Sequence, residues 1–142
     1  MTEVMFHFNV PDKLGYACRL LRKAYGAGSK VGVVADESTL QALDTALWSF
    51  SAVEFLPHCA ASADPAMVAA SPILLSTESS SIPHAQVLLH LGHEVPAGFE
   101  RFERLIELVS TDENDRASAR VRWRHYGTRG YTMIQHDVAA GN

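Results

Sequence analysis

Apolar and polar residues alternate with two different periods along the first part of the chain. Residues 3–10, EVMFHFNV, alternate residue by residue and are rich in Val and Phe, which predicts a first strand. Residues 30–36, KVGVVAD, form the short apolar run typical of a buried parallel strand. Between them, apolar residues recur at three- and four-residue steps and predict one helix, opened by Pro11 and Asp12. Its expected buried residues are Leu14, Ala17, Cys18, Leu21 and Ala24 or Tyr25.

The same succession of helix and strand continues to residue 92. Asp36 or Ser38 can cap a second helix. Its expected buried side carries Leu40, Leu43, Leu47 and Trp48. Residues 53–60 read as a third strand ended by Pro57, and residues 61–71 resemble a loop. Further strands are expected over residues 72–77 and 86–92.

The C-terminal part changes in pattern. Residues 97–111 fit an amphipathic helix, with Phe99, Phe102, Leu105, Ile106 and Val109 on its apolar side. Residues 112–130 predict a second successive helix, opened by Asp112 or Asn114 and closed at Gly130, and residues 131–138 a short strand or extended tail. The alternation of strands and helices predicts an α/β fold with a largely parallel, doubly wound sheet, in a single domain over residues 1–142.

Composition narrows the class of protein. With 12 Lys and Arg against 16 Asp and Glu, the net charge is −4, so an anion site must be local. No signal peptide and no apolar run of membrane-spanning length is visible. Cys18 and Cys59 are far apart and unpaired by any motif, which favours reduced thiols and a cytoplasmic location.

Three motifs could indicate a nucleotide-binding, metal or catalytic site, but each lacks the surrounding sequence that such a site requires. The glycines of YGAGSKVG close a helix and precede a strand, the reverse of the order in a dinucleotide-binding fingerprint, so Gly26 or Gly28 is expected to end the helix. His90 and His93 lack the further ligands that a zinc site needs, and no metal or other cofactor is expected. No GxSxG elbow surrounds a serine, and His58 beside Cys59 does not make an activated thiol, so no catalytic residue is expected.

The segment RVRWRHYGTRGY, residues 120–131, is the richest in arginine. At about 100° per residue, with Arg116 at 0°, Arg120 falls at about 40°, Trp123 at about −20° and Arg124 at about 80°, so these four share one stripe while Arg122 points away. Neither Arg120 nor Arg124 has an acidic residue three or four positions away. The stripe is either a solvated helix face with Trp123 in the core, or a site for a ligand with a carboxylate and an apolar side chain.

Four stretches together resemble the chi subunit family of bacterial DNA polymerase III, the clamp-loader accessory protein. They are EVMFHFNV, LDTALWSFSAVEFLPH, VLLHLGHEVPAGFERFERLIELV and ARVRWRHYGTRGY. The resemblance implies a Rossmann-like fold without nucleotide chemistry and no enzyme activity. It implies two partners: the acidic, Phe-ending C-terminal tail of single-stranded DNA-binding protein, and the psi subunit or, in some bacteria, a helicase.

The resemblance also implies where the partners bind. The tail-binding positions correspond to Arg116, Arg120, Trp123 and Arg124, where some members have Tyr for Trp123 and Lys for Arg124. Trp48 and Phe55 resemble positions of the psi-facing surface, although core packing explains them too, since large apolar residues are mostly buried. A direct single-stranded nucleic-acid binder that stacks bases on the Arg and Trp stripe is the alternative, against which the acidic net charge counts. No membrane contact is expected.

Overall fold

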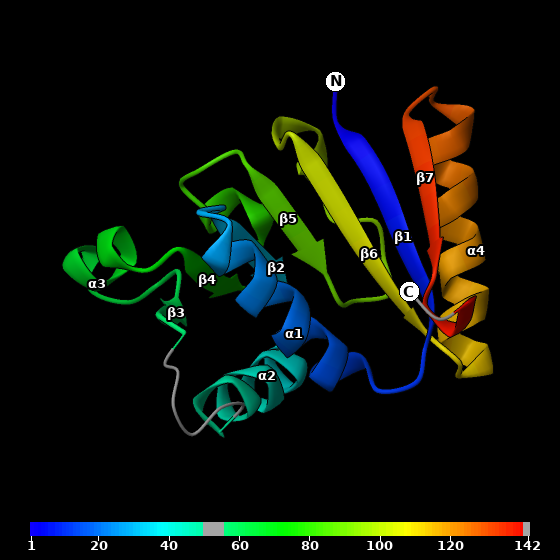
Figure 1. Ribbon diagram of the computed structural model, residues 1–142. Coiled ribbons are helices and arrows are strands. Elements are labelled where there is room, and N and C mark those ends of the chain that lie inside the picture. The colour runs from blue at the N-terminus through cyan, green and yellow to red at the C-terminus, as the bar shows by residue number, and fades with distance from the viewer. Residues whose placement is uncertain (50–55, 141–142) are drawn as a thin grey trace.

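The computed structural model describes residues 1–49 and 56–140. In them, a single parallel sheet of seven strands is flanked by helices, an α/β fold (Figure 1). The order of the strands is β3-β4-β2-β5-β6-β1-β7. The strands are β1 (Glu3–Val10), β2 (Val31–Val34), β3 (His58–Ala60), β4 (Ile73–Ser76), β5 (Val87–His90), β6 (Arg104–Ser110) and β7 (Thr132–Asp137).

Helices cover both faces of the sheet. They are α1 (Lys13–Gly26), α2 (Glu37–Ser49), α3 (Pro65–Ala70) and α4 (Glu113–Thr128), with three short 3-10 turns, η1 (Ser79–Ser81), η2 (Phe99–Arg101) and η3 (Val138–Ala140). One core cluster joins α1 and α2 to one face, and a second joins α4, η2 and Ile82 to the other. No described helix has the length and apolar character needed to cross a membrane.

Helix ends follow local chemistry as predicted. Asp36 caps α2, because its Oδ1 accepts the N–H of Thr39 at 2.9 Å. Gly28 has a φ of +79° and ends α1, with the N–H of Ser29 reaching back to the carbonyl of Ala24 at 3.0 Å. The glycine turn therefore precedes β2 and lies at its amino end, whereas ligands of open α/β sheets bind at carboxyl ends.

The helix predicted over residues 97–111 is wrong. This segment holds η2 and then β6, which pairs with both β5 and β1 inside the sheet. Leu105 to Val109 are buried one after another, as in a strand covered on both faces. The apolar residues of this segment happen to recur at helical spacing, and the side chain of Glu107 among them is fully buried too.

Two smaller corrections concern the region before β4. Residues 61–71, expected as a loop, contain the short helix α3, with Asp64 as N-cap and Pro65 in its first turn. The third strand does not end at Pro57 but begins after it, because proline cannot donate to the ladder and suits the residue preceding a strand at the sheet edge. Residues 53–55 of that prediction lie outside the described part of the chain.

Candidate peptide-binding groove along α4

Helix α4 begins and ends as the sequence predicts. Asp112 is the N-cap, and its Oδ2 accepts the N–H of Asp115 at 3.0 Å. Gly130, with a φ of +79°, follows the helix, and the N–H of Tyr131 bonds to the carbonyl of Tyr126 at 3.3 Å. Four residues on one side of the helix are buried against the sheet: Asp115, Ala119, Arg122 and Tyr126. The predicted stripe lies beside this buried side.

Arg122 enters a buried polar cluster around Glu107 of β6. The Glu107 carboxylate accepts bonds from Arg122 Nε at 3.1 Å and from the Tyr126 hydroxyl at 2.6 Å. Its other oxygen bonds to His90 Nδ1 at 2.6 Å. Burial by itself would raise the pKa of Glu107, but His90 and Arg122 outweigh burial and hold that pKa below its ordinary value.

This cluster fixes how α4 sits on the sheet. Arg122 is 1% exposed, and its Nη1 also donates to the His93 carbonyl and the Ser118 hydroxyl, both at 2.9 Å. These hydrogen bonds offset part of the cost of burying an ionised pair, although Arg122 Nη2 is buried without a hydrogen-bond partner among the described residues. Helix periodicity predicts that Arg122 points away from the stripe, but its partner Glu107 was missed, since residues 97–111 were predicted as a helix and not as a strand of the sheet.

The start of α4 has a second anchor. Asp115 accepts the N–H of Ser110 at 2.8 Å and pairs with Lys13 at 3.1 Å. Burial would raise the pKa of Asp115, but the bond from Ser110 and the charge of Lys13 hold it below its ordinary value. The helix is thus held to the sheet at its first turn and again around Glu107.

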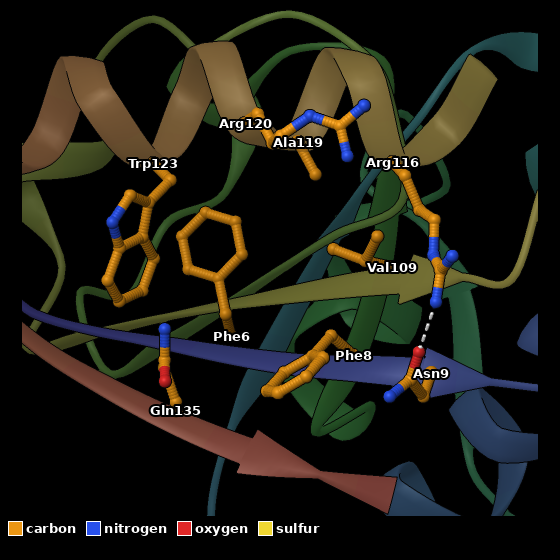
Figure 2. A pocket seen from close by; sticks show the side chains of 9 residues that line it. All are labelled: Phe6, Phe8, Asn9, Val109, Arg116, Ala119, Arg120, Trp123 and Gln135. Carbon is orange, nitrogen blue, oxygen red and sulfur yellow. Dashed lines mark hydrogen bonds between the residues drawn. The ribbon is translucent and has the colours of Figure 1, made fainter. Parts of the chain in front are cut away.

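An apolar pocket of about 370 Å³ lies between α4 and the sheet (Figure 2). Phe6 and Trp123 face each other edge to face in it, with ring centroids 5.1 Å apart. The lining residues are Phe6, Phe8, Asn9, Val109, Arg116, Ala119, Arg120, Trp123 and Gln135. A dry apolar cavity of about 150 Å³ accommodates benzene. The pocket is therefore large enough for a phenyl ring.

Arg116 is held at one end of the pocket by an unusual backbone position. Asn9 has a φ of 60°, a conformation that Asn adopts more readily than other non-glycine residues, and β1 shifts register against β6 between His7 and Val10. Arg116 Nη2 donates to Asn9 Oδ1 at 2.6 Å, as the dashed line in Figure 2 marks. Asn9 Nδ2 in turn donates to Asp137 at 2.9 Å. Arg116 thus bonds directly to a neutral amide oxygen.

Arg120 and Arg124 lie on the exposed side of the helix. Arg120 Nη2 pairs with Glu113 Oε1 at 2.9 Å, and the two side chains are 61% and 74% exposed. The expectation of an unpaired, single-signed stripe is therefore wrong for Arg120, because a partner seven residues away is also nearly in line on a helix. Within the described residues, no ion pair holds Arg124.

A second hollow of about 390 Å³ adjoins the pocket on the far side of Trp123. Its lining residues are Arg120, Trp123, Arg124, Gly127 and Thr128. Because Arg120 and Trp123 border both hollows, the two together form a groove that follows α4. We call them the α4 groove. The structure thus brings Arg116, Arg120, Trp123 and Arg124 to one groove, with apolar walls contributed by β1 and β6.

The other predicted surface lies on α2. Trp48 is 60% exposed, not on the buried side of that helix as its spacing suggested, and its ring packs on His58 with centroids 5.2 Å apart. His58 bonds to Asp44 at 3.0 Å. Exposure argues against core packing as the role of Trp48. Phe55, the other predicted residue, lies outside the described part of the chain.

The residues considered for other chemistry are dispersed in the structure. Among residues 1–49 and 56–140, no group of three or more His, Cys, Asp and Glu side chains is placed to hold a metal ion. Cys18 and Cys59 are both free thiols and belong to the core clusters on opposite faces of the sheet. His90, weighed as a ligand, bonds to Glu107 in the buried cluster.

Comparison with known proteins gives a consistent result. Residues 1–134 match the family model described as DNA polymerase III chi subunit, HolC. A DNA polymerase III subunit chi of Pseudomonas aeruginosa is 35% identical over 142 residues, which cover 96% of each chain. The subunit chi of Haemophilus influenzae is 28% identical over 125 residues, covering 86% of this chain and 85% of the relative.

Proposed function

Because the chain belongs to the DNA polymerase III chi subunit family, we propose that it is a non-enzymatic adaptor of the replisome whose α4 groove binds the acidic C-terminal tail of single-stranded DNA-binding protein. Family membership supports an accessory role in DNA replication. The tail contact and the link to the clamp-loader complex are the finer parts of the proposal. Such a role places the protein in the cytoplasm, in contact with nucleic acid only through its partners.

One observation carries the tail assignment: an apolar pocket large enough for a phenyl ring is bordered by two arginines. Phe6, Phe8 and Val109 supply its apolar walls, while Arg116 and Arg120 stand at its rim. A peptide that ends in phenylalanine presents a ring and a carboxylate on the same residue. The ring would fill the pocket as the carboxylate meets a guanidinium, whose planar fork can bind both oxygens.

The rest of the tail would lie along the second hollow. Arg124 borders that hollow and is exposed, so it can meet the aspartates that precede the last residue. Exposed charge pairs contribute about 0–1 kcal/mol each, which makes the affinity of one short peptide modest. Several tails on one oligomeric partner would raise the overall affinity through avidity.

The test is calorimetric titration with the tail peptide of the cognate single-stranded DNA-binding protein. Wild type should bind, more weakly at high salt because exposed charges are screened over about 8–10 Å at physiological ionic strength. The double variant R120E/R124E should not bind, since two attractions become repulsions. Binding by this variant as tight as that of wild type would refute the proposal.

A matched control and a second ligand sharpen this test. Arg19 and Arg22 lie on α1, on the other side of the sheet from α4, so R19E/R22E makes the same change in net charge away from the groove. It should bind the peptide like wild type. A bare single-stranded oligonucleotide is titrated in parallel. Binding of the oligonucleotide alone would replace the adaptor by the direct nucleic-acid binder that the Arg and Trp stripe also suits.

A second surface around Trp48 is proposed for the psi subunit or a helicase. The ring of Trp48 packs on His58 of β3, which forms the sheet edge opposite to β7, whereas the α4 groove reaches β7 through Gln135. The two surfaces are therefore at opposite ends of the sheet. Trp48→Ala should weaken association with such a partner and leave titration with the tail peptide unchanged. Equal loss of both, with the fold preserved, would show that the surfaces are not separate.

A further inference from the structure

The two ends of the α4 groove carry opposite charge. At the amino end of α4, Asp112 caps the helix and Glu113 reaches forward to pair with Arg120 at 2.9 Å. From residue 116 to residue 136 the chain has no acidic residue. The end that Arg116 borders is therefore next to carboxylates, and the end that Arg124 borders continues into His125 and Arg129 without any.

From this asymmetry we propose that Glu113 closes one end of the groove and makes it selective for an acidic chain that ends there. The inference rests on the proposed function, because it concerns the same groove. It assigns Glu113 a role in specificity: the groove accepts a terminal carboxylate and rejects an acidic chain or a phosphodiester backbone that continues past it.

The proposed placement of the phenylalanine ring in one hollow and of the aspartates in the other sets the direction of the bound chain. The apolar pocket lies toward the amino half of α4, between Arg116 and Trp123, and the second hollow lies toward Thr128. A terminal phenylalanine in the pocket leaves the preceding aspartates beside Arg124. Glu113 lines neither hollow, but it is in the first turn of α4 and pairs with Arg120, which borders both, so a residue added after the phenylalanine would extend toward Glu113.

Glu113 acts on the ligand in two ways. Its carboxylate occupies one guanidinium nitrogen of Arg120, so every anionic ligand must compete with it. A terminating peptide then gains one carboxylate contact and extends no further. A continuing polyanion meets like charge at Glu113 directly. Because Glu113 is 74% exposed, the discrimination by this one residue amounts to about two- to five-fold, the range of exposed charge pairs.

The test compares two synthetic peptides on three proteins. One peptide is aspartate-rich and ends in phenylalanine with a free carboxylate, and the other continues past that phenylalanine with further aspartates. The proteins are wild type, Glu113→Gln and the control Glu37→Gln. Glu37 and Glu113 are both the first residue of a helix, so the control removes the same charge from the same position relative to the helix dipole.

The decisive quantity is the ratio of the dissociation constant of the extended peptide to that of the terminating one. We expect wild type and Glu37→Gln to share a high ratio, and Glu113→Gln to lower it about two- to five-fold at low salt, with the difference shrinking at high salt. A single-stranded oligonucleotide should also bind Glu113→Gln more tightly than Glu37→Gln. An unchanged ratio in Glu113→Gln overturns the inference.

The same titrations separate this inference from the proposed function. If the terminating peptide binds wild type but the ratio does not respond to Glu113, the adaptor function stands and the specificity role of Glu113 is overturned. If the terminating peptide does not bind wild type at all, both the proposed function and the inference fail. A lowered ratio with the control unchanged supports both.

Discussion

Arg120 and Arg122 lie two residues apart on α4, yet their surroundings differ completely. Arg122 is 1% exposed and bonded to the buried carboxylate of Glu107. Arg120 is 61% exposed and meets Glu113 at the surface. The same side chain therefore serves two purposes on one helix: on one side it holds α4 to the sheet, and on the other it remains accessible to a partner. Position around the helix, not residue type, separates the two.

The energetics of the two arginines differ for the same reason. Removing one partner of a buried ion pair leaves an uncompensated charge, whereas an exposed pair exchanges its contacts with water at little cost. Mutations on the two sides of α4 should consequently separate stability from binding. Each of the following experiments tests that separation.

The largest effect is expected for Arg122→Ala. The variant leaves Glu107 buried without its cationic partner on α4, which should lower the free energy of unfolding by about 3–5 kcal/mol. Chemical denaturation measures this directly. Arg120→Ala is the matched control from the exposed side of the same helix. Loss of less than 1 kcal/mol in Arg122→Ala would mean that the buried cluster does not anchor the helix.

The next largest effect on stability is expected for acidification, which should weaken the interactions of Glu107 on the buried side of α4. The pKa of Glu107 lies below its ordinary value of 4.5 in the folded protein, so its contribution to stability is complete above about pH 4.5. That contribution is lost as the pH falls through the folded value. The denaturant concentration at the midpoint of unfolding should therefore decrease as the pH is lowered below 4.5. The Glu107→Gln variant, although less stable at neutral pH, should lose less on acidification than wild type; an equal loss would contradict this role.

The smallest effect on the free energy of unfolding is expected for substitutions on the exposed side of α4. R120E/R124E should change the free energy of unfolding by no more than about 0.5 kcal/mol, as for ordinary surface positions. Its melting temperature should therefore stay close to that of wild type even where the tail peptide no longer binds. A large loss of stability would show that the exposed arginines help to hold α4, and the comparison between its two sides would fail.

Much of the fold could be read from local patterns. The first strand, the first two helices and their caps, and the C-terminal helix with Asp112 and Gly130 at its ends all depend on nearby residues. Residues 97–111 could not be read in this way. Their apolar spacing fits a helix face, and only pairing with β1 and β5 on both sides makes Leu105 to Val109 a buried strand.

The candidate site likewise has a part that local sequence patterns predicted and a part that they did not. Helix periodicity by itself put Arg116, Arg120, Trp123 and Arg124 on one side of α4, because a side chain's direction on a helix depends only on its position in the helix. It did not supply the walls of the pocket. Those come from Phe6, Phe8 and Val109 on strands more than a hundred residues earlier or just before the helix, which the folded sheet alone brings together.

The amino-acid sequence by itself determined which segments can form helices, where their caps lie and which arginines of α4 share a stripe. These properties depend on backbone sterics and on residues within a few positions of one another. Tertiary structure decided that Arg122 and Glu107 are a buried pair, that Trp48 is exposed and that an apolar pocket opens beside Arg116. Burial and long-range contacts depend on the order of the strands in the sheet, which no local pattern encodes.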